Sequence, residues 1–201
     1  MIPIVLASAS PRRRALLEAL GIEVSVQPSA VEETLDGAPA EVALNNAIAK
    51  RDDIAHKISE PAIVIAADTI VVLEEEIMGK PHDLDEARAM LARLSGNTHE
   101  VLTGLAVANT HSGQEASGLE RTAVTFRDLS PRDIDGFVET VRPLDRAGAY
   151  TVDGPGTLLV TRYEGCYQNV LGLPIVRLDA LLREVGDGLS ARVRGEKARF
   201  L

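Results

Sequence analysis

A single carboxylate interrupts a long apolar stretch of this 201-residue chain. The stretch, AIVIAADTIVVL at residues 62–73, holds one charged residue, Asp68, and is rich in β-branched side chains, so it predicts one or two buried strands. An unpaired buried carboxylate costs several kcal/mol unless a cation, a metal ion or hydrogen-bond donors offset it. We therefore expect Asp68 to face a cleft as a metal ligand or general base. The alternative is an aspartate that caps a turn between two strands.

Strand and helix patterns alternate on both sides of this stretch, which predicts an α/β fold. Strand patterns occur at residues 3–7, 22–27, 101–108, 121–126 and 157–163, and helical patterns at 11–20, 40–58, 84–94, 131–141 and 173–185. The three glutamates at 74–76 predict a hairpin turn. Neither a repeat nor a linker divides the chain, so we expect one domain over residues 1–185, followed by a polar, basic tail at 186–201.

Composition and charge exclude several classes of protein. The net charge of −9 disfavours a nucleic-acid binder, which would have to use the basic tail from Arg192 to Arg199. No stretch reaches the ~20 apolar residues of a membrane span, and the basic residues of the N-terminus follow its apolar run, unlike those of a signal peptide. Cys166 is the sole cysteine. We therefore expect a cytoplasmic protein that binds neither membrane nor nucleic acid.

Three arginines, Arg12–Arg14, lie in the first turn of a predicted helix that begins at Ser10. Each cation there is unfavourable by ~0.3–1 kcal/mol, because a helix N-terminus already carries partial positive charge. A bound anion would reverse the sign of this effect. Two interpretations stay open: a phosphate cradle built with Ser8 and Ser10, or solvated arginines, one of them Arg14 paired with Glu18.

Three further candidate site residues, Lys80, Glu33 and Lys50, each allow a functional and a structural interpretation. Lys80, within GKP at 79–81, suits a phosphate or a leaving pyrophosphate, but it also fits a solvent-exposed turn. Glu33 in a polar loop could complete an oxygen ligand set for Mg²⁺. Lys50 on a helix is equally ambiguous. The histidines have no zinc-type spacing, and neither a Walker loop nor GxGxxG is present.

Taken together, these segments resemble the Maf family, the septum-formation-inhibitor-like nucleotide pyrophosphatases. The resemblance runs from Ile4 to about Leu182, and the order and spacing of its pieces make it specific. The matching pieces are LASASPRRRALL, VEET, AIAK, AADTIVVLEEEIMGKP, EARAMLARLSGNTHEVLTGLAV, TAVTF, PLDRAGAY and YEGCYQNVLGLP.

The resemblance implies an α/β fold of the inosine-triphosphatase type, with a mixed central sheet flanked by helices and two lobes around a cleft. It also implies hydrolysis of nucleoside triphosphates between the α- and β-phosphates, a divalent cation (Mg²⁺ or Mn²⁺), a cytoplasmic location and a homodimer. A house-cleaning role that removes non-canonical nucleotides would fit such an activity. The family's historical name keeps a second hypothesis open, a nucleotide-binding regulator of cell division without turnover.

The resemblance also assigns roles to the unusual residues above. Asp68 looks like the proton acceptor that activates water, and Arg13 and Lys80 would stabilise the departing pyrophosphate. Glu33 and Asp68 would hold the metal ion. The predicted substrate-binding residues are Ser8, Ser10, Arg12, Lys50, Thr69 and Asp153.

Asp153 departs from the family pattern. Members selective for thymidine and uridine triphosphates usually read GAYGIQG, and this chain reads GAYTVDG at 148–154. Members that act on 7-methylguanosine triphosphate have glutamate at that position, but this chain keeps Arg12 and Thr69, as the thymidine/uridine members do. We therefore expect dTTP and UTP as substrates, with 7-methyl-GTP as the alternative if the Asp153 carboxylate contacts the base. Arg146 stands where the family commonly has lysine, and it keeps the charge.

Overall fold

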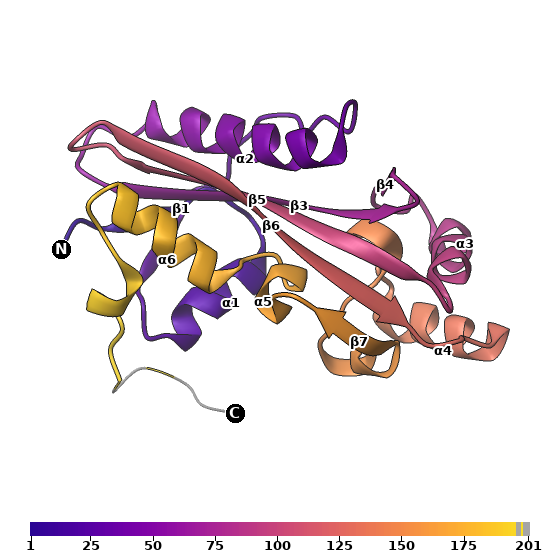
Figure 1. The fold of residues 1–201 in the computed structure, drawn as a ribbon. Coiled ribbons are helices and arrows are strands. Elements are labelled where there is room, and N and C mark those ends of the chain that lie inside the picture. The colour runs from indigo at the N-terminus through magenta and orange to yellow at the C-terminus, as the bar shows by residue number, and fades with distance from the viewer. Residues whose placement is uncertain (196–197, 199–201) are drawn as a thin grey trace.

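The protein is built on a seven-stranded mixed sheet with strand order β2-β1-β3-β5-β6-β7, and β4 pairs with β3. The computed structural model describes residues 1–195 and 198 (Figure 1). The strands are β1 (Ile4–Leu6), β2 (Val24–Val26), β3 (Ile63–Leu73), β4 (Glu76–Met78), β5 (Thr98–Asn109), β6 (Gln114–Phe126) and β7 (Val160–Glu164). β1 pairs in parallel with β2 and β3, and the other pairs are antiparallel. The expected mixed central sheet is confirmed.

Helices flank both faces of this sheet (Figure 1). They are α1 (Pro11–Ala19), α2 (Pro39–Ala55), α3 (Leu84–Leu94), α4 (Pro131–Val141), α5 (Tyr167–Val170) and α6 (Ile175–Glu184), with the 3-10 helices η1 (Ala147–Ala149), η2 (Gly154–Leu158) and η3 (Leu189–Ala191). α2 covers one face, while α1 and α6 lie on the other face at one end, and α3 and α4 lie at the far end (Figure 1). In the part of the chain that is described, every helix is too short or too polar to cross a membrane.

The side chains of β3 alternate between these two faces, as a strand requires. Val64 and Ile70 pack in clusters beneath α2. Ile65 points the other way, into a core shared with α1 and α6, and Val71 belongs to a second core shared with α3 and α4. One face of the sheet therefore carries two separate cores, one at each end, and these form the two lobes.

The edge of β3 that faces away from β5 is covered in two separate pieces. β1 pairs with residues 63–65, and β4 pairs with residues 71–73. Between them, residues 66–70 have no strand on that edge among the described residues. Asp68 and Thr69 lie in this gap, so the loops that follow β1 and β4 meet beside them.

The structure corrects several predicted element boundaries. The predicted stretch at 62–73 forms one strand, β3, which begins at Ile63, and the expected turn follows it at Glu74 and Glu75, which both have positive φ. β5 and β6 extend well beyond the apolar segments, because polar residues at 98–100 and 114–120 pair along the same hairpin. β7 begins only at Val160, because residues 154–158 form η2.

The segment at 173–185 is also divided differently from the prediction. α6 begins at Ile175 because the residue before Pro174 is disfavoured in a helix. Beyond α6, Leu189 is buried in the core of the α1–α6 lobe, and Arg192 donates to Ile2 O at 2.8 Å. Within the predicted basic tail, residues 196, 197 and 199–201 lie outside the described residues.

Candidate active site

The gap in the edge of β3 opens into a cleft of about 390 Å³ between the lobes. Two loops define its walls: Ala7 N donates to Ile65 O at 2.8 Å and extends the pairing of β1, and β4 ends at Met78 opposite Val71. All but one of the predicted site residues line the cleft. They are Ser8, Ser10, Arg12, Arg13, Glu33, Lys50, Asp68, Thr69 and Lys80.

Asp68 is held by two donors from one face of α2. Its Oδ1 accepts from Lys50 Nζ at 2.7 Å, and its Oδ2 accepts from Asn46 Nδ2 at 3.0 Å. Asp68 is 5% exposed, so these donors supply the compensation that a buried carboxylate requires. Asn46 was not among the predicted site residues. The signal was its position four residues before Lys50, which places both side chains on the same helix face.

Lys50 joins Asp68 to the loop that contains Glu33. Lys50 Nζ lies 2.6 Å from Glu33 Oε1 as well as 2.7 Å from Asp68 Oδ1. Asn46 fastens the same loop, because its Nδ2 donates to Thr34 O at 2.9 Å. One helix face therefore fixes both predicted metal ligands around a single cation.

These two carboxylates fit a divalent metal ion that arrives with a phosphate. Within residues 1–195 and 198, no cluster of three or more histidine, cysteine or acidic side chains could enclose a metal ion by itself. Mg²⁺, however, is commonly held by one or two carboxylates together with substrate phosphates. Glu33 and Asp68 already converge on one cationic atom, Lys50 Nζ, so their oxygens provide suitable donor chemistry.

The buried guanidinium of Arg13 connects three segments of the cleft wall by hydrogen bonds. Its Nε donates to Gly172 O at 2.8 Å, its Nη1 to Ser8 Oγ at 2.9 Å and its Nη2 to Thr69 Oγ1 at 3.0 Å. Burial lowers the pKa of the Arg13 guanidinium, and the carboxylate of Asp68 opposes this shift. Arg13 thus ties α1 to β3 and to the loop before α6, and its remaining N–H groups have no acceptor among the described residues.

The other two arginines of the cluster behave differently from Arg13. Arg14 pairs with Glu18 at 2.6 Å in solvent, which confirms the alternative interpretation for this one residue. Arg12 lines the cleft and makes neither a hydrogen bond nor an ion pair with any described residue. Burial lowers the pKa of Arg12, and the neighbouring charge of Arg146 lowers it further. Ser10 caps the helix as predicted, its Oγ accepting from the Arg13 N–H.

Thr69 points to the face opposite Asp68. Its Oγ1 lies 2.9 Å from Oγ1 of Thr103, its cross-strand neighbour on β5. Thr103 in turn donates to Asn169 O at 3.2 Å, and the fully buried Asn169 donates to Val101 O at 2.9 Å. Thr103 and Asn169 were not among the predicted site residues, because their contacts depend on strand register and on the packing of α5 against the sheet.

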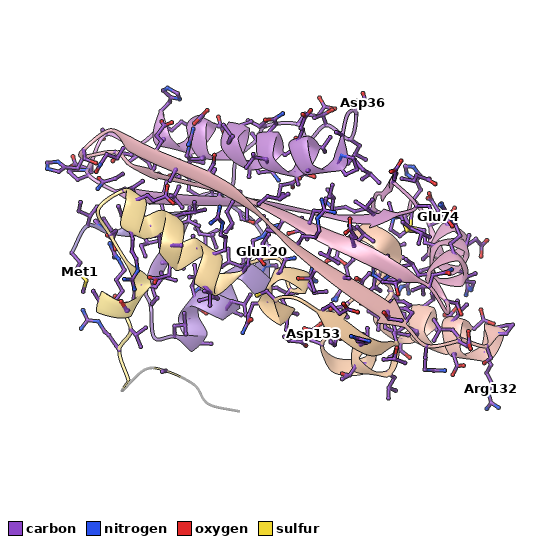
Figure 2. All side chains as sticks on the ribbon, viewed as in Figure 1. Met1, Asp36, Glu74, Glu120, Arg132 and Asp153 are labelled. Atoms are coloured by element: carbon purple, nitrogen blue, oxygen red, sulfur yellow. The ribbon has the colours of Figure 1, made fainter. Side chains whose placement is uncertain are left out.

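Asp153 is the predicted site residue that does not line the cleft. Its side chain is 54% exposed and reaches the surface on the side of the sheet away from α2 (Figure 2). Its Oδ1 accepts a hydrogen bond from Thr151 and lies 3.9 Å from Arg146 Nη1. Thr151, Arg146 and Tyr150 occupy the cleft wall in front of it.

Comparison with known proteins places the chain among relatives of similar length. The dTTP/UTP pyrophosphatase of Moorella thermoacetica is 46% identical over 96% of this chain and 100% of the relative. The dTTP/UTP pyrophosphatase of Alkaliphilus oremlandii is also 46% identical, over 89% of this chain and 94% of the relative. A solved HAM1 protein from Coxiella burnetii superposes with a TM-score of 0.45 and 20% identity, covering 63% of this chain and 73% of that protein. The sequence model of the Maf-like proteins matches residues 3–185, and the chain belongs to this family.

Proposed function

We propose that this protein hydrolyses nucleoside triphosphates to the monophosphate and pyrophosphate, with dTTP and UTP as its substrates. One observation carries the proposal: a buried, doubly anchored carboxylate, Asp68, opens onto the same cleft as Arg12 and Lys80, two cations without an ion-pair partner among the described residues. Arg12 is half-buried and Lys80 is exposed, so both cations remain available to a ligand that also reaches the buried carboxylate, and such convergence of charged groups in a cleft is typical of a binding site. A metal-bound triphosphate has the chemistry to join them.

The phosphate chain would lie along the N-terminal turn of α1. The positive end of a helix favours anions, and Ser8 and Ser10 add hydroxyl groups that can donate. Arg12 and Lys80 would contact the β- and γ-phosphates, and Arg13 would add the N–H groups that its protein acceptors leave free. These cations would stabilise the charge that builds on the departing pyrophosphate.

Asp68 would act as the general base. Its carboxylate is oriented by Lys50 and Asn46 and still has lone pairs for a water molecule. The proton of that water would pass to Asp68 as the oxygen attacks the α-phosphorus. When bound at Glu33 and Asp68, Mg²⁺ or Mn²⁺ supplies positive charge that polarises the α-phosphate.

Two observations support dTTP and UTP over 7-methyl-GTP. The two relatives described above are named dTTP/UTP pyrophosphatase, and the similarity covers nearly their whole length. The Asp153 carboxylate, whose contact with the base would favour guanine, lies outside the cleft lining. The cytoplasmic location and the homodimer stay predictions.

The test is pyrophosphate release from dTTP, UTP, CTP, GTP and 7-methyl-GTP with Mg²⁺ or Mn²⁺. We expect dTTP and UTP to give the highest kcat/KM, and Asp68→Asn to lower kcat by roughly 10²–10⁴-fold, the usual contribution of a general base. Asp36→Asn is the matched control, because Asp36 is exposed in the loop before α2 (Figure 2). Nucleotide binding without pyrophosphate release would instead support the non-catalytic regulator, and preference for 7-methyl-GTP would overturn the assignment of substrate.

A further inference from the structure

Arg146 lines the cleft, and two of its side-chain nitrogens are buried without a hydrogen-bond partner among the described residues. Its side chain is 22% exposed, and the two nitrogens are Nε and Nη1. The nearest carboxylates are Asp145, 3.4 Å from Nε, and Asp153, 3.9 Å from Nη1. They balance the charge but leave these N–H groups unsatisfied, a state that costs about 1–3 kcal/mol or more for each buried group.

The loop that carries Arg146 is tied to the segment that carries Lys80. Gly148 has a φ of +67°, and its N–H donates to Gly79 O at 3.0 Å, which ties the loop to the residue before Lys80. A Cβ at Gly148 would lie 3.1 Å from Val71, so the loop packs closely against β3. This backbone contact brings the segments that carry Arg146 and Lys80 together on the cleft wall, so both cations line the same cleft.

Arg12 belongs to the same electrostatic environment. It lines the cleft from α1, and the charge of Arg146 acts on its guanidinium, as do the charges of Asp145 and Asp153. Two guanidinium groups that repel one another, each without a hydrogen bond to the described protein, are satisfied together by an anion placed between them. Of the substrate's parts, the phosphate chain has the matching charge and oxygen geometry.

We propose that Arg146 and Arg12 form a clamp on the β- and γ-phosphates, and that Asp153 orients Arg146 instead of reading the base. This inference rests on the proposed function and names the residues that select a triphosphate. Arg146 is the binding residue. Asp153 is a positioning residue, itself held by the hydrogen bond from Thr151. The two departures from the family pattern, at 146 and 153, then form one matched pair.

The first experiment measures ligand binding by calorimetry with the full chain, using pyrophosphate and dTMP as separate probes. Arg146→Met should weaken pyrophosphate binding about 10- to 100-fold, equivalent to about 1.4–2.8 kcal/mol, and leave dTMP binding unchanged within about twofold. Arg146→Lys should retain part of the affinity for pyrophosphate, because lysine keeps the positive charge but lacks the paired N–H donors of a guanidinium. Arg132→Met is the matched control, since Arg132 lies exposed on α4, far from Asp153 (Figure 2). Weakened dTMP binding with unchanged pyrophosphate binding would overturn the proposal.

The second experiment tests whether Asp153 acts through Arg146. Asp153→Asn should weaken pyrophosphate binding, and the Arg146→Met/Asp153→Asn double variant should bind pyrophosphate no more weakly than Arg146→Met alone. Additive losses would show that Asp153 contacts the ligand independently and would refute the positioning role. The ratio of kcat/KM for dTTP to that for dTDP should fall in Arg146→Met.

Failure of this inference is distinguishable from failure of the proposed function. If wild-type protein releases no pyrophosphate from any nucleotide, the proposed function fails, but the calorimetric comparison still decides the role of Arg146. If wild-type protein is active and Arg146→Met binds pyrophosphate normally, the clamp alone is refuted. Circular dichroism of each variant confirms that it is folded before binding is compared.

Discussion

Replacing Lys50 with methionine should destabilise this protein more than replacing its partner Asp68 with asparagine. The side chains of Lys50 and Asp68 are 10% and 7% exposed, and Lys50 Nζ also contacts Glu33, whose side chain is 42% exposed. Removing the ammonium leaves two carboxylates without their shared cation, and one of them is buried. Removing the charge of Asp68 leaves Lys50 paired with Glu33, so the remaining charges still have partners.

The expected magnitudes follow from this difference. Removing one partner of a buried ion pair costs about 3–5 kcal/mol, and we place Lys50→Met in this range. Asp68→Asn exchanges a charged hydrogen bond for a neutral one and should cost about 1–2 kcal/mol. The Lys50→Met/Asp68→Asn double variant replaces both charges with neutral groups and should cost only about 2 kcal/mol. The coupling energy between the two positions is therefore about 3 kcal/mol.

Urea unfolding followed by circular dichroism measures these free energies, because the chain has no tryptophan for fluorescence. Lys57→Met is the control from the same part of the chain: Lys57 pairs with Asp53 but is 50% exposed, so its loss should cost under about 1 kcal/mol. If the two single losses simply add in the double variant, Lys50 and Asp68 are not partners in the folded protein.

Two further predictions concern the stability of the fold. Burial lowers the pKa of His99 from 6.5 to about 4. Between pH 4 and pH 6.5, His99 is therefore protonated in the unfolded chain and neutral in the folded chain. The free energy of unfolding of the wild type should then fall by about 2 kcal/mol from pH 6.5 to about pH 5, and this decrease should be absent in His99→Gln. Equal pH dependence of the two proteins in urea titrations would contradict this prediction. Gly104→Ala would place a Cβ 2.1 Å from Ala43 O of α2 and should cost about 1–3 kcal/mol by thermal unfolding, whereas Gly136→Ala, with open space around it, should be neutral or stabilising.

The sequence predicted those features that local chemistry determines. Asp68 in its apolar stretch required compensation, and Lys50 and Asn46 provide it. The helix beginning at Pro11 and its cap at Ser10 followed from helix-terminus preferences. These residues depend on neighbours close in sequence or on a burial cost that any fold must meet.

Features that depend on distant pairing could not be predicted. Arg13 donates to Gly172 and Thr69, which lie far along the chain, so its bracing role was invisible in the local pattern. The full length of β6 depends on its register with β5, because residues 114–120 carry no apolar run. The role proposed for Arg146 depends on its distances to Asp153 and Asp145. From the sequence, Arg146 was expected only to keep the positive charge of the lysine that is common in the family.

The most direct test of whether a water molecule attacks the α-phosphorus is hydrolysis of dTTP in water enriched in oxygen-18, followed by mass spectrometry of the products. If Asp68 activates water beside the α-phosphate, the heavy oxygen enters dTMP, and the pyrophosphate stays unlabelled. Heavy oxygen in pyrophosphate, or the release of labelled orthophosphate, would place the attack on another phosphorus and contradict the proposed geometry of the cleft.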